Sequence, residues 1–101
     1  MMVAKRAFAK RASDLELQRL YRAFATLDDP AEVKALMDDL CTIREVDEMA
    51  QRLDVAFRLD TGESYTAIQE QTGVSAATIA RVSKCLNYGS QGYRRVIDGE
   101  Q

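Results

Sequence analysis

Hydrophobic residues recur every three or four positions along most of the chain, a spacing typical of amphipathic helices. Two such repeats lie close together between residues 64 and 86, on either side of Gly73. Ser64 and Ser75 each precede a repeat and can cap a helix by accepting a bond from a backbone N–H group. Gly73 can adopt the left-handed conformation that ends the first helix. The residues predicted to face inward are Ile68, Val74, Ile79, Val82 and Leu86.

The second helix of this pair, residues 75–86, has a small and basic outward face. This face carries Ala77, Ala80, Arg81 and Lys84. Two helices joined by a glycine turn, the second with such a face, are typical of the DNA-binding helix-turn-helix. A plain helical hairpin explains the same pattern, and Gln69 replaces the small residue that many helix-turn-helix units have four places before the glycine. The DNA-binding interpretation is the one we favour.

Three further helices are predicted between residues 13 and 63. Each opens with a capping box, in which a polar residue and an acidic residue three positions later satisfy free backbone N–H groups. The three pairs are Ser13 with Glu16, Asp29 with Glu32, and Thr42 with Glu45. The apolar stripes that follow are Leu17, Leu20, Tyr21, Phe24 and Leu27 on the first helix, Val33, Leu36, Met37 and Leu40 (expected to be buried) on the second, and Val46, Met49, Ala50, Leu53 and Phe57 on the third.

No segment alternates with the period of a strand, so the sequence predicts an all-α fold of about five helices. One helical domain is expected over residues 13–97, with the hairpin at 64–86, a basic arm at 1–12 and a short tail at 98–101. The arm can touch DNA, but a frayed terminus is the favoured interpretation because chain ends are usually disordered. After a loop, residues 93–97 either help to hold a phosphate backbone or cover the core as a flap.

A dimer is expected because the first two helices have wide apolar faces and short connections. A compact monomer of five helices can bury those faces only in part, and small helical domains often complete their core by dimerising.

Charge is segregated along the chain, although the net charge is only −2. Residues 1–12 carry a charge of +4, residues 13–63 carry −7, and residues 64–101 carry +1. Such segregation fits a protein that turns one surface toward phosphate and keeps the rest soluble. A solvated helical surface explains the acidic part alone equally well.

Composition argues against an enzyme, a metal site and a membrane protein. The chain has no histidine, the commonest general base and metal ligand, and no nucleophile motif or phosphate loop. No apolar run approaches the roughly 18 residues of a membrane span, and the N-terminus lacks the apolar core of a secretory signal. Cys41 and Cys85 match no metal spacing and are expected to be reduced thiols in a cytoplasmic protein. No cofactor is predicted.

In its helix order and in its hairpin, the chain resembles the Trp repressor superfamily, in particular the Trp-repressor-related proteins of the YerC/YecD type. The resemblance extends from about Ser13 to Ile97. It is carried by the segments IREVDEMAQRL (43–53), TGVSAATIARVSKCL (72–86) and LNYGSQGYRR (86–95). It implies an intertwined homodimer whose paired hairpins enter successive major grooves of a palindromic DNA site.

The resemblance also implies which residues contact DNA. Alanine can touch a thymine methyl group, but it cannot make the bidentate hydrogen bonds that read guanine or adenine. We therefore expect modest base discrimination, with Arg81 and Lys84 on phosphates and some help from DNA shape. The predicted DNA-binding residues are Thr66, Gln69, Ser75, Ala76, Ala77, Thr78, Ala80, Arg81 and Lys84.

An effector pocket is implied as well. Two arginines of the Trp repressor sandwich its tryptophan corepressor, and Arg52 and Arg81 occupy the matching positions. Val82 replaces a glycine that leaves room for the indole ring, and Cys85, a weak hydrogen-bond partner, replaces the serine that holds the amino group. We therefore expect that tryptophan is not the effector. The two arginines can instead pair with acidic residues or phosphate, and ordinary surface ion pairs are their simplest alternative role.

The sequence thus predicts a dimeric transcriptional regulator that reads a palindromic DNA site. The alternative is a helical homodimer that acts through protein contacts and has lost DNA binding. The acidic middle of the chain and the bare recognition face support this alternative.

Overall fold

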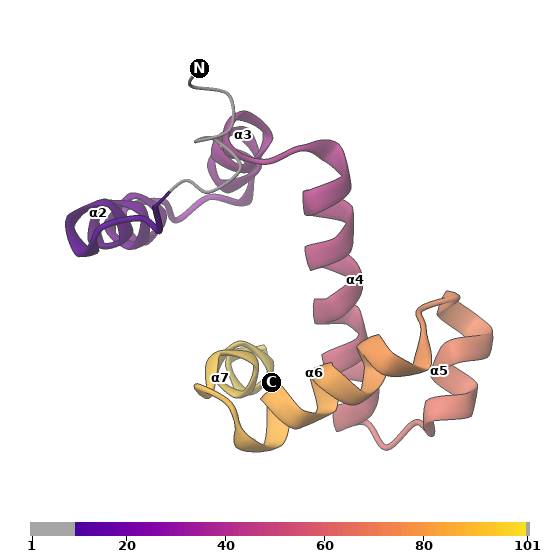
Figure 1. The fold of residues 1–101 in the computed structure, drawn as a ribbon. Helices are drawn as coiled ribbons and strands as arrows, with labels where there is room; N and C mark the ends of the chain where they lie inside the picture. Colours follow the sequence, from indigo (N-terminus) through magenta and orange to yellow (C-terminus); the bar gives the residue numbers. More distant parts are fainter. Residues whose placement is uncertain (1–9, 101) are drawn as a thin grey trace. The chain divides into compact units, whose positions relative to one another are not determined.

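The computed structural model describes residues 10–100 as helices joined by short connections (Figure 1). The proposed N-terminal arm lies mostly outside the described residues. No helix within the described range is both long and apolar enough to cross a membrane. The six helices of that range, with no strand among them, confirm the all-α prediction: α2 (Asp14–Ala25), α3 (Pro30–Leu40), α4 (Ile43–Asp60), α5 (Tyr65–Thr72), α6 (Ala76–Tyr88) and α7 (Gly92–Gly99).

The chain divides into two compact units, Met1–Leu40 and Cys41–Gln101. In the first unit, α2 begins with the predicted capping box. The Ser13 N–H donates to Glu16 Oε1 at 2.7 Å, and the Glu16 N–H donates to Ser13 Oγ at 3.2 Å. Asp29 caps α3 by accepting a bond from the Ala31 N–H at 2.9 Å. Neither side-chain bond of the predicted capping box between Asp29 and Glu32 is formed, so Asp29 caps α3 through Ala31 alone.

Neither α2 nor α3 has a fully buried side chain. Leu15 is 77% exposed and Leu40 is 54% exposed, while Val33, Leu36 and Met37 of α3 are half-buried. The prediction of a buried stripe at Val33, Leu36, Met37 and Leu40 is therefore wrong for the single chain. The reason is that two short helices have too little opposing surface to enclose each other's apolar faces.

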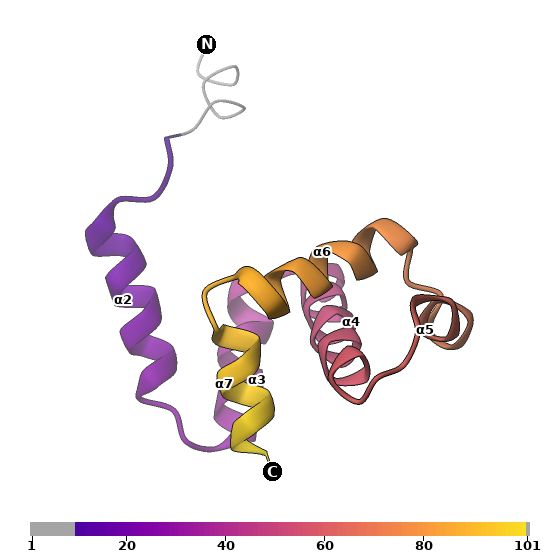
Figure 2. The ribbon, with the colours of Figure 1, turned by 90° about the horizontal axis from the view of Figure 1, so that it is seen from below.

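The core of the second unit forms where α6 crosses the C-terminal half of α4. In Figures 1 and 2, α5 lies beyond one end of α6 and α7 lies at the other end. Every hairpin residue predicted to face inward is buried there. The buried residues are Val55, Ala56, Ile68, Val74, Ile79, Val82, Leu86 and Ile97.

Helix α4 contributes to this core only through its last turns. Val55 and Ala56 are fully buried, and Phe57 and Leu59 pack against the cluster. The rest of the predicted α4 stripe (Val46, Met49, Ala50 and Leu53) does not join the core, and Ile43 at the start of the helix is 83% exposed. The cause is the crossing point, since α6 covers α4 only near its C-terminal end.

The C-terminal segment is helical and docks back on the core. Helix α6 continues past Leu86 to Tyr88, and α7 follows after a short loop. Ile97 of α7 is buried and Tyr93 packs against the cluster. Arg94 Nη1 lies 2.8 Å from Asp60 Oδ1 at the end of α4 and 3.3 Å from Asp98 Oδ1. Of the two interpretations left open by the sequence, these contacts favour a flap over the core.

Candidate nucleic-acid interface

Both helices of the hairpin begin with the predicted serine caps. Ser64 Oγ accepts a bond from the Ala67 N–H at 3.1 Å, and Ser75 Oγ accepts one from the Thr78 N–H at 3.2 Å. These bonds satisfy N–H groups that the first turn of a helix leaves free. The start of each helix is therefore fixed by a residue that directly precedes it.

The turn between the helices is fixed by its own residues. Gly73 has a φ of 76°, and its N–H donates to the Gln69 carbonyl oxygen at 2.9 Å. The Thr72 hydroxyl donates to the Ile68 carbonyl oxygen at 2.6 Å and accepts a bond from the Val74 N–H at 3.1 Å. The direction in which the chain leaves α5 and enters α6 is thus set locally.

Helix α6 separates an apolar face from a small, basic face. Its inward residues are part of the core, whereas Arg81 and Lys84 are exposed. The ion pairs among residues 10–100 use Lys34, Arg44 and two other arginines, but not Arg81 or Lys84. Both cations are therefore available to an external anion. The other exposed residues of the face are Ala76, Ala77 and Ala80.

The predicted DNA-binding residues lie on α5, the turn and α6. All of them are exposed except Thr78, which is half-buried. The Thr78 hydroxyl accepts a bond from Ser75 Oγ at 3.1 Å, so this side chain belongs to the cap of α6. Thr66 and Gln69 are exposed on α5.

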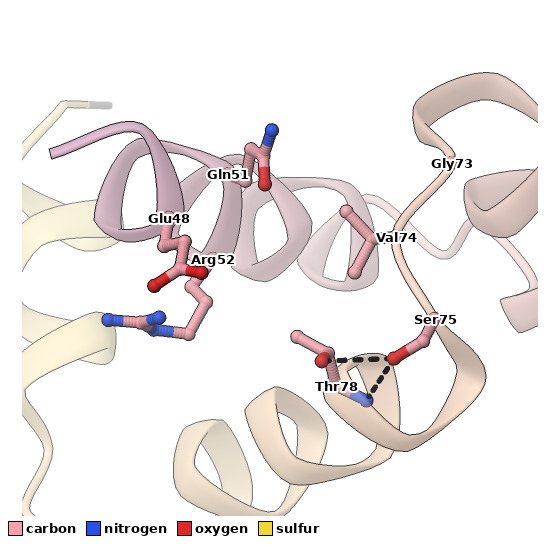
Figure 3. A pocket seen from close by; sticks show the side chains of 7 residues that line it. All are labelled: Glu48, Gln51, Arg52, Gly73, Val74, Ser75 and Thr78. Carbon is pink, nitrogen blue, oxygen red and sulfur yellow. Dashed lines mark hydrogen bonds between the residues drawn. The ribbon is translucent and has the colours of Figure 1, made fainter. Parts of the chain in front are cut away.

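A polar hollow of about 330 Å³ lies between α4 and the start of α6. In Figure 3, Glu48 and Arg52 lie on the α4 side of the hollow, and Ser75 and Thr78 lie on the α6 side. Arg52 takes part in none of the ion pairs among residues 10–100. The hollow therefore offers a cation, a carboxylate and two hydroxyl groups next to the turn of the hairpin.

The residues predicted to form an effector pocket lie at different places in the part of the chain that the structure describes. Arg52 lines the polar hollow, but Val82 is buried in the core. Cys85 is exposed and lines a second hollow of about 530 Å³, formed with residues of α7 and the loop before it, such as Tyr93. Arg81 is exposed on the outward face of α6.

Sequence reasoning missed a polar cluster at the C-terminal end of α4. Arg58 Nε lies 2.8 Å from Asp54 Oδ2, and Arg58 Nη1 lies 3.2 Å from Glu63 Oε1 and 2.7 Å from Gln71 Oε1. The bonds to Asp54 and then to Glu63 raise the pKa of Arg58, so the guanidinium group stays charged. The only sequence signal was the spacing of four residues between Asp54 and Arg58.

Comparison with known proteins agrees with this geometry. The family model described as Trp repressor protein matches residues 15–101. Over 83 residues, the chain is 46% identical to the uncharacterized protein YerC of Bacillus subtilis (strain 168). This match covers 82% of this chain and 80% of YerC. A solved TrpR-like protein from Eubacterium eligens ATCC 27750 shares 39% identity with a TM-score of 0.81, over 86% of this chain and 90% of that one.

A candidate Trp repressor from Staphylococcus aureus, also solved, has 35% identity and a TM-score of 0.81, over 87% of this chain and 88% of that one. The resemblance inferred from the hairpin and the tail is thereby confirmed. Its helices, its hairpin and these matches show that the chain belongs to the Trp repressor family.

Proposed function

We propose that the protein is a dimeric transcriptional regulator that reads a palindromic DNA site with α6, and that tryptophan is not its effector. The observation that carries this proposal is the outward face of α6. That face is exposed, small enough to approach a groove closely, and equipped with two cations, Arg81 and Lys84, that pair with no carboxylate among residues 10–100. The core behind it holds the helix through Ile79, Val82 and Leu86.

The chemistry of this face favours contacts to the DNA backbone over direct base reading. Arg81 and Lys84 supply charge for phosphates, while three alanines supply only methyl groups for thymine. Thr66 and Gln69 on α5 can add single hydrogen bonds. The operator is therefore expected to be recognised with modest base discrimination and partly through its shape.

Dimerisation is supported by apolar side chains that the single chain leaves open to solvent. Leu15 and Tyr21 of α2, Leu40 of α3 and Ile43 of α4 are all more than half exposed. Neither α2 nor α3 has a fully buried side chain of its own, and an apolar surface left exposed normally marks an interface. A second copy of the chain is the occupant that the family relationship favours, and paired hairpins would require a site with two-fold symmetry.

The proposal that tryptophan is not the effector is supported by two side chains. Val82 is buried, and its branched side chain occupies volume that a glycine at this position would leave open. Cys85 contributes a thiol instead of the hydroxyl group implied by the family pattern.

The direct test is iterative selection of a random-sequence DNA pool at low and near-physiological salt. The wild-type protein should enrich a palindrome, and the double variant Arg81→Ala/Lys84→Ala should fail to retain it. The control variant Lys34→Ala/Arg44→Ala removes the same formal charge from exposed residues outside the hairpin and should retain the palindrome. A pool that stays random, with retention lost at the higher salt, would overturn the proposal.

That negative outcome would favour a homodimer that acts through protein contacts. A protein interface with an apolar centre depends much less on salt than phosphate binding does. Sedimentation equilibrium of the full chain tests the dimer separately, since a monomer at all accessible concentrations would contradict it.

A further inference from the structure

Arg58 joins three segments of the second unit that are separate in sequence. Its side chain extends from α4, where it binds Asp54, to Glu63 in the loop before α5 and to Gln71 near the end of α5. The Arg58 side chain is 27% exposed, so the cluster is partly shielded from solvent. Charge-assisted hydrogen bonds in such a setting are stronger than those between neutral groups.

Helix α5 depends on such contacts for its position. It has eight residues, fewer than a helix needs for stability in isolation, and only one of its side chains, Ile68, is fully buried. One buried side chain fixes a point on the helix but not the direction of its axis. A second attachment at Gln71, close to the other end, restricts that direction.

The attachment lies directly before the turn that leads to α6. Gln71 is followed by Thr72, whose hydroxyl binds the Ile68 carbonyl oxygen and the Val74 N–H, and then by Gly73. A displacement of Gln71 is therefore transmitted to the turn and to the exposed residues of α5.

We propose that Arg58 is a positioning residue for DNA recognition. It binds Gln71 and thereby sets the orientation, relative to α4, of α5 and of the turn between α5 and α6. This inference rests on the proposed DNA-binding function. Arg58 acts through Gln71 and not on DNA itself, because its charge is already opposed by two carboxylates, those of Asp54 and Glu63. The cluster has a net charge of −1 and repels phosphate.

The chain contains a matched control for this cluster. Arg94 Nη1 also binds two carboxylates, those of Asp60 and Asp98, and its side chain is exposed to a similar extent. This second cluster attaches α7, not the hairpin, to α4. Arg58→Gln and Arg94→Gln therefore each remove a guanidinium group that binds two carboxylates, the first where α5 is attached to α4 and the second where α7 is attached to α4.

The experiment measures affinity of the full-length protein for its selected palindrome and for a scrambled duplex, over a range of salt concentrations. Arg58→Gln and Gln71→Ala should each lower the ratio of the two affinities about tenfold for each half-site, the size of one charge-assisted hydrogen bond. The double variant should lose no more than either single variant, because both remove the same attachment. The salt dependence should not change, and Arg94→Gln should leave the ratio within about twofold.

Hydrogen exchange of the free protein gives the second readout and shows that each variant is folded. Arg58→Gln should raise exchange in α5 and leave α7 protected, and Arg94→Gln should do the reverse. If Arg58→Gln fails to fold, Gln71→Ala carries the test, since it leaves both ion pairs of Arg58 in place.

Three outcomes would overturn the inference while wild-type recognition stays intact. These are an unchanged affinity ratio in Arg58→Gln and Gln71→Ala, an equal loss in Arg94→Gln, and a reduced salt dependence in Arg58→Gln, which would mean direct phosphate contact. A wild-type protein that prefers no palindrome would instead refute the proposed function, and the role of Arg58 with it.

Discussion

Removal of the two free cations of α6 should change the salt dependence of DNA binding by a calculable amount. Arg81 and Lys84 are exposed and pair with no carboxylate among residues 10–100. In a dimer, the variant Arg81→Ala/Lys84→Ala loses four charges. Because log K falls with log salt by about 0.9 for each phosphate contact, the slope should become shallower by about 3 to 4.

The assay is fluorescence anisotropy of a labelled palindromic duplex titrated with protein at several salt concentrations. The double variant Lys34→Ala/Arg44→Ala is the control, because it also removes two exposed cations but on α3 and α4. Lys34 lies 2.7 Å from Asp38, and Arg44 lies 3.5 Å from Glu48, so both are already partly neutralised. This control should change the slope by less than about 1.

The reasoning would be refuted by equal slopes in the two variants. Equal slopes would mean that binding responds to the total charge of the protein and not to phosphate contacts of α6. A wild-type slope near zero would also refute it, because a face with two free cations per chain cannot bind DNA without releasing counterions.

Four further predictions concern the fold and the effector. Ile79→Ala should lower the free energy of unfolding by about 2–5 kcal/mol because it opens a cavity in the core. Urea unfolding at fixed protein concentration measures this loss, and a loss below about 1 kcal/mol would contradict the prediction. Gly73→Ala should lower the free energy of unfolding by about 1–2 kcal/mol in the same assay. The whole loss should come from backbone strain at the φ of 76°, because no atom lies within 4 Å of the added Cβ. An unchanged free energy of unfolding would show that this strain is absent. Hydrogen bonds from the Thr42 backbone and side chain lower the pKa of Glu45, so its contribution to stability is present above its ordinary pKa of 4.5 and is lost as the pH falls through the lower folded value. Unfolding curves at acidic pH should show this loss in the wild type and less of it in Glu45→Gln. Titration calorimetry with tryptophan should give no binding heat, and saturable heat would reverse the conclusion about Val82.

The hairpin could be predicted from sequence because its determinants are local. A serine cap needs only a residue and a backbone group three positions away, and an inward face needs only the helical period. The caps at Ser64 and Ser75 and the buried face of α6 could therefore be predicted from the sequence alone. Helix α7 lacks such a signal, because its N-cap, Gln91, has a φ of 71° and makes no capping bond with its side chain.

Features that depend on how helices cross could not be predicted in this way. The stripe on α4 has the correct period, yet the part of a long helix that is buried depends on where another helix crosses it. In this chain the crossing lies at Val55 and Ala56. The bond between Arg58 and Gln71 spans 13 residues and arises only when α5 has folded back on α4. The outward residues of α6 could be read from the sequence, but the bond between Arg58 and Gln71 could not.

The separation of the two faces of α6 has a consequence for how this protein can evolve. Ala76, Ala77 and Ala80 are exposed and contribute no side chain to the core, whereas the residues that stabilise the helix lie on the opposite face. Exchanging an exposed alanine for another ordinary residue costs at most about 0.7 kcal/mol of helix propensity. Long polar side chains can therefore be introduced at these positions with little loss of stability. Under the proposed function, a few such substitutions would give the same scaffold a new operator preference.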